Sequence, residues 1–412
     1  MKTVSMAVVG GGAAGLAAAV SAGRAGGSVV LCERMAKLGR KLLATGGGRS
    51  NLLNEKLDAS AFTAECRGLV GGVFGRFGKP EIKEFFGGLG LALTAEGDRI
   101  FPATQQAASV LKVLELELGR LPVEVRLSWD AMEIVWKDGA FQLRSRDGSS
   151  FRAARVVLAG GGKSYPALGA DGNAYRLAGA FGHGLIEPVP SAVPVVVNDK
   201  LCHHLQGQKI RVRAKSLIGG RMGEEADGEL LFASYGLSGT AVLDISESLS
   251  RALNREGRKD VEIAVDLVPF LNEEDLAARF ETRAADNWPE KEWAAGILPG
   301  KFGAAIGTWI REGRDIPAGE VRGEGGGRVA RFLAGRIKDL RFKVVGTRGW
   351  NEAEFTSGGI PANEVDPETL ESKLRPGLFL AGEILDVQGQ RGGFNLAWAW
   401  ASGCLAGKAG LR

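Results

Sequence analysis

The sequence predicts an α/β protein in which a parallel-sheet domain is interrupted by an insertion. At the start of the chain an apolar strand, a glycine-rich turn and a helix of small residues follow one another. The pattern changes after a proline-rich crossing near residue 190, and a strand, a glycine-rich turn and a helix return in the last seventy residues. A length of 412 residues allows two or three domains.

The opening segment carries the strongest signal. An apolar run at 4–9 predicts a buried parallel strand, and a helix of small residues follows. Between them Gly10, Gly12 and Gly15 fit the pattern G-x-G-x-x-G. In that pattern the first glycine makes a tight turn, the second lets backbone approach a pyrophosphate, and the third lets helix and strand pack closely.

The helix after this turn begins at Ala13 and Ala14, so its free N–H groups and positive dipole end face the phosphates. A second apolar strand, 28–32, ends at Glu33 and Arg34. The Glu33 carboxylate stands where a ribose 2′-hydroxyl is expected, roughly twenty residues after the glycines. This order of elements predicts a dinucleotide site rather than an ordinary α/β turn.

A second glycine-rich loop follows in residues 34–51. Basic residues, Arg40 and Lys41 among them, precede a triple glycine, and Gly47, Gly48 and Asn51 follow. Backbone N–H groups can approach a phosphate or a flavin edge where no Cβ intervenes. The alternative is a basic surface loop.

The middle of the first domain is predicted to contain short helices and strands. The predicted elements are helices at 80–87 and 105–118 and strands at 123–127, 132–137, 140–144 and 156–158. The last of these strands ends at Ala159, Gly160 and Gly161, which suits another close approach of backbone to a dinucleotide. The following Gly-Lys-Ser is not a P-loop, because the first glycine of that motif would fall on Val157, inside the strand.

The insertion extends from about Val189 to Arg341. Strands at 195–197, 209–217, 229–232 and 261–265 predict an antiparallel sheet or small barrel, and 271–288 and 292–335 are mostly helical. We therefore expect a first part of the nucleotide-binding domain at 1–188, a β-barrel and helical domain at 189–341, and a second part at 342–412. The Pro-rich crossing at 187–194 is the predicted boundary.

Charge is concentrated locally in the insertion, although the net charge of the chain is only +4. At a strand's period of two, one face carries Lys209, Arg211, Arg213 and Lys215. A second basic cluster comprises Arg328, Arg331, Arg336, Lys338, Arg341 and Lys343. These residues indicate either a solvated sheet face and helix or a surface that follows the phosphates of RNA.

The last seventy residues repeat the strand, turn and helix pattern. A buried strand at 378–381 ends in Gly382 and Glu383, and a glycine-rich entry with Gly393, Phe394 and Asn395 leads into a helix. Such an entry again delivers N–H groups to a bound group, here the flavin ring or its ribityl chain.

Other features limit the classes of protein. Four scattered cysteines without a C-x-x-C pair argue against a disulfide framework, a zinc ribbon or a dithiol centre, and indicate a cytoplasmic setting. No apolar run is long enough for a membrane span. The His203-His204 pair offers no credible ligand cage, so we predict no metal site.

The motifs together resemble the two-dinucleotide-binding-domain flavoproteins, and within them the BaiN/RdsA group of NAD(P)/FAD-dependent oxidoreductases, which are aminoacetone-oxidase-like. The resemblance spans nearly the whole chain and is carried by GGGAAGLAAA, GRKLLATGGGRSN, DRIFPAT, LAGGGKSYPALGADGNAY, LLFASYGLSG and AGEILDVQGQRGGFNLAWAWASG. It implies a Rossmann-like FAD-binding domain with an inserted β-barrel plus helical domain. One departure is Ser50, where members often have cysteine, so any chemistry that depends on that cysteine is absent or different here.

The resemblance also implies residue roles. The first glycine turn and Glu33 would contact the FAD pyrophosphate and ribose, and the backbone of Ala131 the adenine. Gly382 and Glu383 would lie at the ribityl chain. Gly393, Phe394 and Asn395 would lie under the flavin pyrimidine edge.

The predicted function is that of an FAD-dependent oxidoreductase, in which flavin carries hydride from NAD(P)H to an unspecified substrate. With no second G-x-G-x-x-G domain, the nicotinamide would dock transiently. Tyr165 and Arg391 could orient a substrate or donate a proton, or simply pack their loops, so the catalytic residues stay unassigned. A family member is associated with dihydrouridine in ribosomal RNA, so reduction of uridine there is one alternative, and a non-catalytic flavin-binding protein is another. The oligomeric state stays open.

Overall fold

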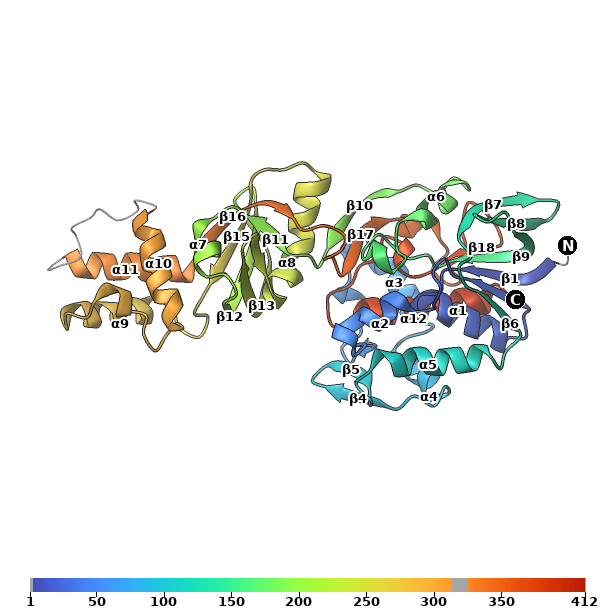
Figure 1. Ribbon diagram of the computed structural model, residues 1–412, viewed down its shortest axis with the longest axis horizontal. Helices are drawn as coiled ribbons and strands as arrows, with labels where there is room; N and C mark the ends of the chain where they lie inside the picture. Colours follow the sequence, from blue (N-terminus) through green and yellow to red (C-terminus); the bar gives the residue numbers. More distant parts are fainter. Residues whose placement is uncertain (1–2, 313–324, 412) are drawn as a thin grey trace. The chain divides into compact units, whose positions relative to one another are not determined.

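The computed structural model describes residues 3–312 and 325–411, and it divides into two compact units (Figure 1). The first comprises Met1–Pro188 and Phe355–Arg412, and the second comprises Val189–Glu354. The predicted class, a Rossmann-like α/β domain with an inserted barrel and helices, is confirmed. The chain enters the second unit through β10 (Ile186–Ser191) and returns through β17 (Phe355–Gly359), and these two strands pair with each other.

A seven-stranded sheet forms the centre of the first unit. Its order is β6-β2-β1-β9-β8-β7, and β18 pairs with β9 off this path. The strands are β1 (Thr3–Val9), β2 (Val29–Cys32), β6 (Val123–Arg126), β7 (Ala131–Lys137), β8 (Ala140–Ser145), β9 (Ser150–Leu158) and β18 (Leu378–Leu380). The neighbours of β1 run parallel to it, so the carboxyl ends of β1, β2, β9 and β18 meet at one edge.

Helices cover this sheet. The described α-helices of the unit are α1 (Ala13–Arg24), α2 (Arg40–Ala44), α3 (Arg67–Phe74), α4 (Lys79–Gly87), α5 (Ala107–Leu118), α6 (Asn173–Gly179) and α12 (Phe394–Ala409). A hairpin, β4 (Leu93–Glu96) and β5 (Arg99–Pro102), pairs with the short β3 (Leu53–Asn54). This hairpin was not among the predicted elements.

Helices α1 and α12, from opposite ends of the sequence, lie side by side (Figure 1). Glycines let them approach closely: a Cβ on Gly403 would lie 2.2 Å from the Ala14 carbonyl oxygen, and one on Gly407 would lie 2.3 Å from that of Ala18. Backbone contact at this distance leaves no room for a side chain. The two ends of the chain therefore form one continuous core.

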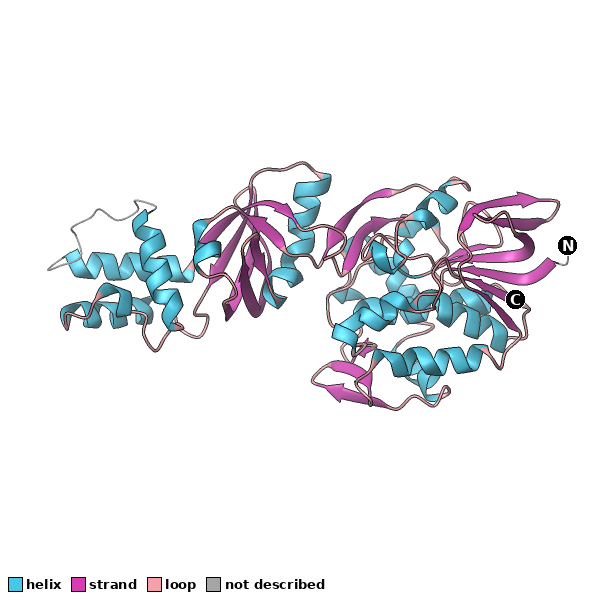
Figure 2. Ribbon diagram, viewed as in Figure 1, coloured by secondary structure: helices cyan, strands magenta, loops and turns pink. Residues whose placement is uncertain are grey.

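A closed barrel forms the centre of the second unit, and its strands are magenta in Figure 2. The strands in barrel order are β11 (Val195–Val197), β14 (Gly236–Ser238), β13 (Arg221–Ala233), β12 (Lys209–Ile218), β15 (Val261–Asp266) and β16 (Leu340–Thr347). The described α-helices are α7 (Lys200–His204), α8 (Thr240–Ser250), α9 (Glu273–Ala285), α10 (Gly300–Glu312) and α11 (Gly325–Lys338). Part of the predicted helical stretch, 313–324, lies outside the described residues.

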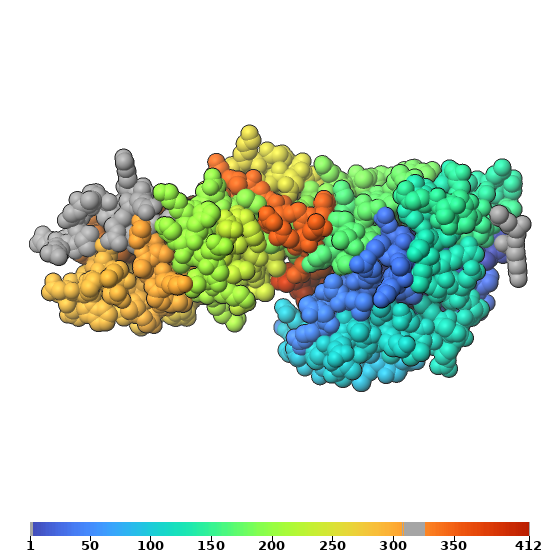
Figure 3. All heavy atoms as spheres, in the orientation of Figure 1, coloured from blue at the N-terminus to red at the C-terminus, as the bar shows by residue number. Residues whose placement is uncertain are grey.

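The second boundary of the insertion differs from the prediction. We expected the return to the first domain at residue 342, but β16 pairs with β15 and β11 inside the barrel, so residues 342–354 belong to the second unit. The orange-red segment after β16 lies on the surface of this unit (Figure 3). The sequence change near Phe342 is thus the last barrel strand and not the return crossing.

The basic face of β12 is balanced by acids on β13. Val212 and Ala214 are buried, and the cations alternate with them on the other face. Three of the four form ion pairs: Lys209 with Glu229, Arg213 with Glu225 and Asp227, and Lys215 with Glu225. Members of the second cluster are paired as well, Arg331 with Glu281, Lys338 with Asp266 and Arg341 with Asp339. Both surfaces are therefore far less positive than the cations alone indicate.

The described helices include none with the length and apolar character that crossing a bilayer requires. All four cysteines are buried free thiols.

Candidate functional site

The three glycines of the turn between β1 and α1 differ in what a side chain at each position would meet. Gly10 has a φ of +113°, and a Cβ there would lie 2.4 Å from the Ala159 carbonyl oxygen at the end of β9. A Cβ on Gly15 would lie 1.8 Å from the Gly10 carbonyl oxygen, so helix and turn are in direct backbone contact. A Cβ on Gly12 would meet no atom of the described chain within 4 Å. Gly12 therefore borders open space at the start of the helix.

The start of α1 is suited to an anion. Gly12 is its N-cap and has no side chain, and the first turn, Ala13 to Gly15, contains no acidic residue. The first N–H groups of the helix and its positive dipole end thus point at the open space beside Gly12. A diphosphate fits these residues, because it needs N–H donors and space that no Cβ occupies.

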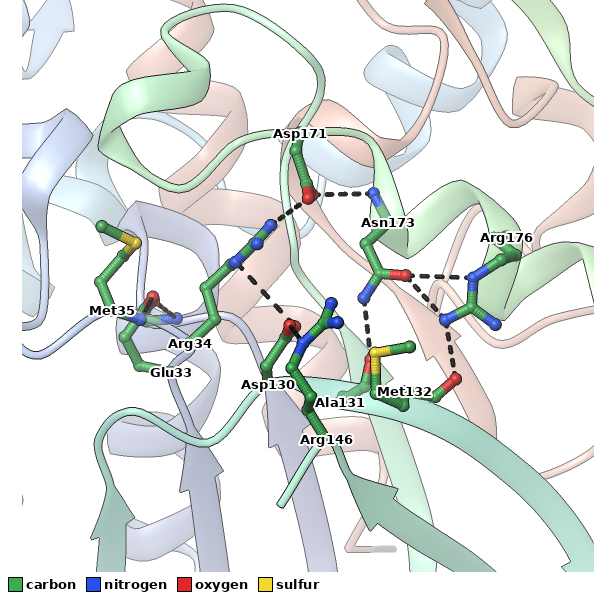
Figure 4. Close-up of polar contacts among 11 residues, drawn as sticks. Glu33, Arg34, Met35, Asp130, Ala131, Met132, Arg146, Asp171, Asn173 and Arg176 are labelled. Carbon is green, nitrogen blue, oxygen red and sulfur yellow. Dashed lines mark hydrogen bonds and ion pairs between the residues drawn. The ribbon is translucent and has the colours of Figure 1, made fainter. Parts of the chain in front are cut away.

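Glu33, at the end of β2, holds the glycine turn in place. Its two carboxylate oxygens each accept a hydrogen bond at 2.7 Å, one from the Gly11 N–H and one from the Met35 N–H. Figure 4 shows Glu33 and Met35. Burial raises the pKa of the Glu33 carboxyl, while the hydrogen bonds from Met35 and Gly11 oppose that rise. The carboxylate therefore has a structural role, and its contact with a ribose stays a prediction.

We expect Glu33→Ala to destabilise the first unit by about 2 kcal/mol, because two inward-facing N–H groups lose their acceptor. The same change should weaken FAD binding. Thermal unfolding and a fluorescence titration with FAD measure the two effects. Glu133→Ala, which removes an exposed carboxylate on β7, is the matched control. Equal stability of the two variants would contradict the structural role of Glu33.

Arg34 and Ala131 lie in a polar cluster beside Glu33 (Figure 4). The Arg34 guanidinium forms an ion pair with Asp171. The side-chain amide of Asn173 donates to the Ala131 carbonyl oxygen at 2.8 Å. The backbone of Ala131, which is predicted to contact adenine, is therefore fixed by a hydrogen bond from Asn173.

Lys41 and Glu383 meet although they are far apart in the sequence. The Lys41 ammonium lies 2.5 Å from Glu383 Oε2 and 2.6 Å from Ser164 Oγ. The other Glu383 oxygen, Oε1, accepts from Ser164 Oγ at 3.1 Å and from the Thr356 N–H at 2.8 Å. This network joins the second glycine loop, the segment after β9, β17 and the segment after β18.

The peptide of Gly382 is fixed by α12. Its N–H donates to Ser402 Oγ at 3.0 Å, and its carbonyl oxygen accepts from the Trp398 indole N–H at 3.1 Å. A Cβ on Gly382, whose φ is +77°, would lie 2.7 Å from Ala14 Cβ. Glu383 is thus held directly beside the start of α1.

The second glycine loop contacts the start of α12. A Cβ on Gly393 would lie 2.6 Å from the Leu53 carbonyl oxygen and 2.8 Å from Asn51 Oδ1. Gly47 and Gly161 both have positive φ, and a Cβ on either would meet no described atom within 4 Å, as at Gly12. The second glycine loop at Gly47 and the segment after β9 at Gly161 therefore both border open space.

Some predicted residues have other partners. The Asn395 amide bonds to the Gly389 N–H and carbonyl and so fixes its own loop. Phe394 packs edge-on against Phe62 at a centroid distance of 6.2 Å. Arg40 lines a separate small pocket with Leu111 and Leu127. Gly160 packs closely on α6, and Gly48 has a φ of +88° in its loop.

Sequence reasoning missed two residues of the network. Ser164 bonds to both Lys41 and Glu383, and Thr356 Oγ1 accepts from the N–H groups of Lys163 and Ser164 at 2.8 and 3.2 Å. Ser164 lies in the Gly-Lys-Ser segment that was set aside as a false P-loop. Thr356 carries no local signal, because its role depends on a contact across the sequence.

Comparison with known proteins gives the family. The family model described as HI0933-like protein Rossmann domain matches residues 4–409. This chain belongs to the HI0933-like family. The resemblance that the motifs indicated is thereby confirmed, and the protein is placed with the flavoprotein oxidoreductases.

Two relatives of this HI0933-like protein have named activities. It is 36% identical over 409 residues to a 3-dehydro-bile acid delta(4,6)-reductase of Clostridium scindens, with 98% of each chain covered. It is 29% identical over 408 residues to a ribosomal RNA dihydrouridine synthase of Escherichia coli, with 98% of this chain and 96% of the relative covered. In fold it is similar to a flavocytochrome c3 fumarate reductase, at 15% identity and a TM-score of 0.50, over 100% of this chain and 78% of that chain.

Proposed function

We propose that this HI0933-like protein is an FAD-dependent oxidoreductase that takes hydride from NAD(P)H and reduces a small organic substrate. The observation that carries the proposal is that three features of the site lie in the same unit. These features are the open turn at Gly12, the Glu33 carboxylate at one end, and the Lys41–Glu383 pair at the other. All of them belong to a single packed unit. Along an extended FAD the ribose, the diphosphate and the ribityl chain follow one another, and Glu33, the Gly12 turn and the Lys41–Glu383 pair would contact them in that order.

The residues of these three features have separate roles in this proposal. The N-terminus of α1 would hold the diphosphate through N–H groups, and Glu33 would accept from a ribose hydroxyl. Lys41 and Glu383 would meet the ribityl and flavin end. When bound there, FAD supplies the hydride chemistry, and the chain binds it, orients it and excludes water.

Tyr175 contributes a buried proton close to this network. Its hydroxyl has no hydrogen-bond partner among the described residues. Burial raises the pKa of Tyr175, and the charges of Glu383 and Asp386 raise it further. The hydroxyl therefore stays protonated at neutral pH and is able to donate a hydrogen bond.

For the substrate we propose a small molecule with a carbon–carbon double bond conjugated to a carbonyl group. The support is the 36% identical relative named as a 3-dehydro-bile acid delta(4,6)-reductase, which aligns over almost the whole chain. NAD(P)H would dock transiently, because the first unit contains a single glycine fingerprint of the G-x-G-x-x-G type. We also propose a cytoplasmic location, since the four cysteines are free thiols.

The test is anaerobic reduction of the purified yellow protein with NADH and with NADPH, followed by reoxidation with candidate acceptors. We expect one nicotinamide to bleach the flavin absorbance and a conjugated enone to restore it. A protein that neither contains FAD nor takes it up would overturn the proposal. A protein whose flavin no nicotinamide bleaches would favour a non-catalytic flavin-binding role.

A second candidate function is reduction of uridine to dihydrouridine in ribosomal RNA, supported by the relative of that name. The cations of β12 are paired with acids of β13, so this face is a poor candidate for the RNA-binding surface. We expect RNA affinity, if present, to be unaffected by reversing Lys209, Arg211, Arg213 and Lys215. Reoxidation of the reduced flavin by ribosomal RNA, with dihydrouridine formed, would favour this candidate over the enone.

A further inference from the structure

One edge of the central sheet in the first unit is left uncovered. The sheet branches at β9, so its outer strands are β6, β7 and β18. Helix α6 covers the start of β7, because the side chains of Asn173 and Arg176 donate hydrogen bonds to the first two carbonyl groups of that strand. Residues 370–372 lie along β18 and bond to its backbone. Within the described residues no strand pairs with the outer edge of β6 (Figure 1).

The backbone of Val125, in β6, points away from the sheet. The Glu33 N–H donates to the Arg126 carbonyl oxygen at 2.8 Å, so the backbone groups of Arg126 face β2. Along a strand, the backbone groups of successive residues point to opposite sides of the strand. The N–H and carbonyl groups of Val125 therefore face outward, and the residue is 36% exposed.

The side chains of β6 form one charged row and one apolar row. Arg126 Nε donates to Glu124 Oε1 at 2.7 Å, so these two side chains share a face. Because side chains alternate along a strand, Val123 and Val125 share the opposite face. Leu127, directly after the strand, is 45% exposed. Both rows thus reach the surface at the edge of the sheet.

We propose that this edge pairs with the same edge of a second copy of the chain, antiparallel and about a twofold axis at Val125. In this register Val125 of each copy donates its N–H to the Val125 carbonyl of the other copy, and Glu124 of each copy lies opposite Arg126 of the other. The opposite charges attract across the pair. Charged residues on an edge strand normally prevent such pairing, but here the order Glu-Val-Arg makes the strand complementary to itself.

The test is sedimentation equilibrium of the full-length protein over a wide range of concentration. Because a short edge buries a small interface, we expect a monomer–dimer equilibrium with a Kd on the order of micromolar. Val125→Pro removes an N–H that faces solvent in the monomer, so it leaves the bonds to β2 intact. We expect this change to raise the Kd of the dimer at least about tenfold. Val125→Thr, which keeps the N–H and a β-branched side chain, is the matched control and should dimerise like the unaltered protein.

A charge exchange tests the register independently. Glu124→Arg places two arginines opposite each other on both sides of the twofold axis, so the Kd should again rise at least about tenfold. Combining Glu124→Arg with Arg126→Glu restores opposite charges, so the double variant should dimerise nearly as the unaltered protein does. Thermal unfolding shows whether each variant is folded, and the charge exchange still decides the proposal if Val125→Pro is not. A protein that is monomeric at every concentration, or a dimer that neither Val125→Pro nor Glu124→Arg weakens, would overturn the proposal.

Discussion

Gly12→Asp is expected to abolish FAD binding while leaving the protein folded. A Cβ at this position meets no described atom within 4 Å, so the side chain fits without strain. The new carboxylate would cap α1 and occupy the N–H groups that the diphosphate needs. It would also place like charges in contact, which costs several kcal/mol, so we expect affinity for FAD to fall at least about 100-fold.

The matched control is Gly68→Asp at the start of α3, where a Cβ likewise meets no described atom within 4 Å. Both variants should unfold within about 0.5 kcal/mol of the unaltered protein when FAD is absent. Fluorescence titration with FAD and thermal unfolding of the FAD-free protein measure the two properties. Gly12→Asp that purifies yellow and binds FAD normally would show that the diphosphate lies elsewhere.

Gly403→Ala is expected to destabilise the first unit by about 3 kcal/mol. The added methyl group would lie 2.2 Å from the Ala14 carbonyl oxygen and 3.0 Å from Ala17 Cβ, so α12 must move away from α1. In a unit of this size the loss corresponds to a fall in Tm of roughly 6–12 °C. Because Ser402 and Trp398 hold Gly382 from α12, FAD affinity should fall as well.

Gly87→Ala provides the control for this substitution, because a Cβ on Gly87 in α4 meets no described atom within 4 Å. We expect it to raise stability by about 0.5 kcal/mol, the usual gain for alanine over glycine in a helix. Thermal unfolding of the two variants gives the comparison directly. An unchanged Tm for Gly403→Ala would mean that α1 and α12 do not pack as described.

Local signals account for what could be predicted from the sequence. Gly12 and Gly15 depend on the turn and helix that contain them, so their spacing was sufficient, whereas the close contact of Gly10 is made with Ala159 after β9, far away in the sequence. The neighbouring strand and the position of Glu33 at its end could also be predicted from nearby residues. Whether each predicted residue contacts FAD stays a prediction.

Two elements were not recognised from the sequence, each for a different reason. Pro188 and Pro190 indicated a break, yet both lie in β10, which pairs with a single strand, β17. Such an edge position tolerates prolines because it leaves N–H groups free of ladder bonds. The β4–β5 hairpin was missed because each of its strands has only four residues.

The charge balance on the barrel could have been found. Glu225, Asp227 and Glu229 alternate with the same period of two as the cations of β12. Two adjacent strands with opposite charges at matched spacing predict cross-strand ion pairs. The cations alone therefore overestimate the positive charge of this face.

The pairing of β10 with β17 has a consequence for how such proteins change over time. The strand that leaves the nucleotide-binding half and the strand that re-enters it are hydrogen-bonded neighbours. Residues 189–354 are therefore connected to the nucleotide-binding half through two neighbouring strands, β10 and β17. A single recombination event could therefore replace residues 189–354 and leave the nucleotide-binding half of the chain intact.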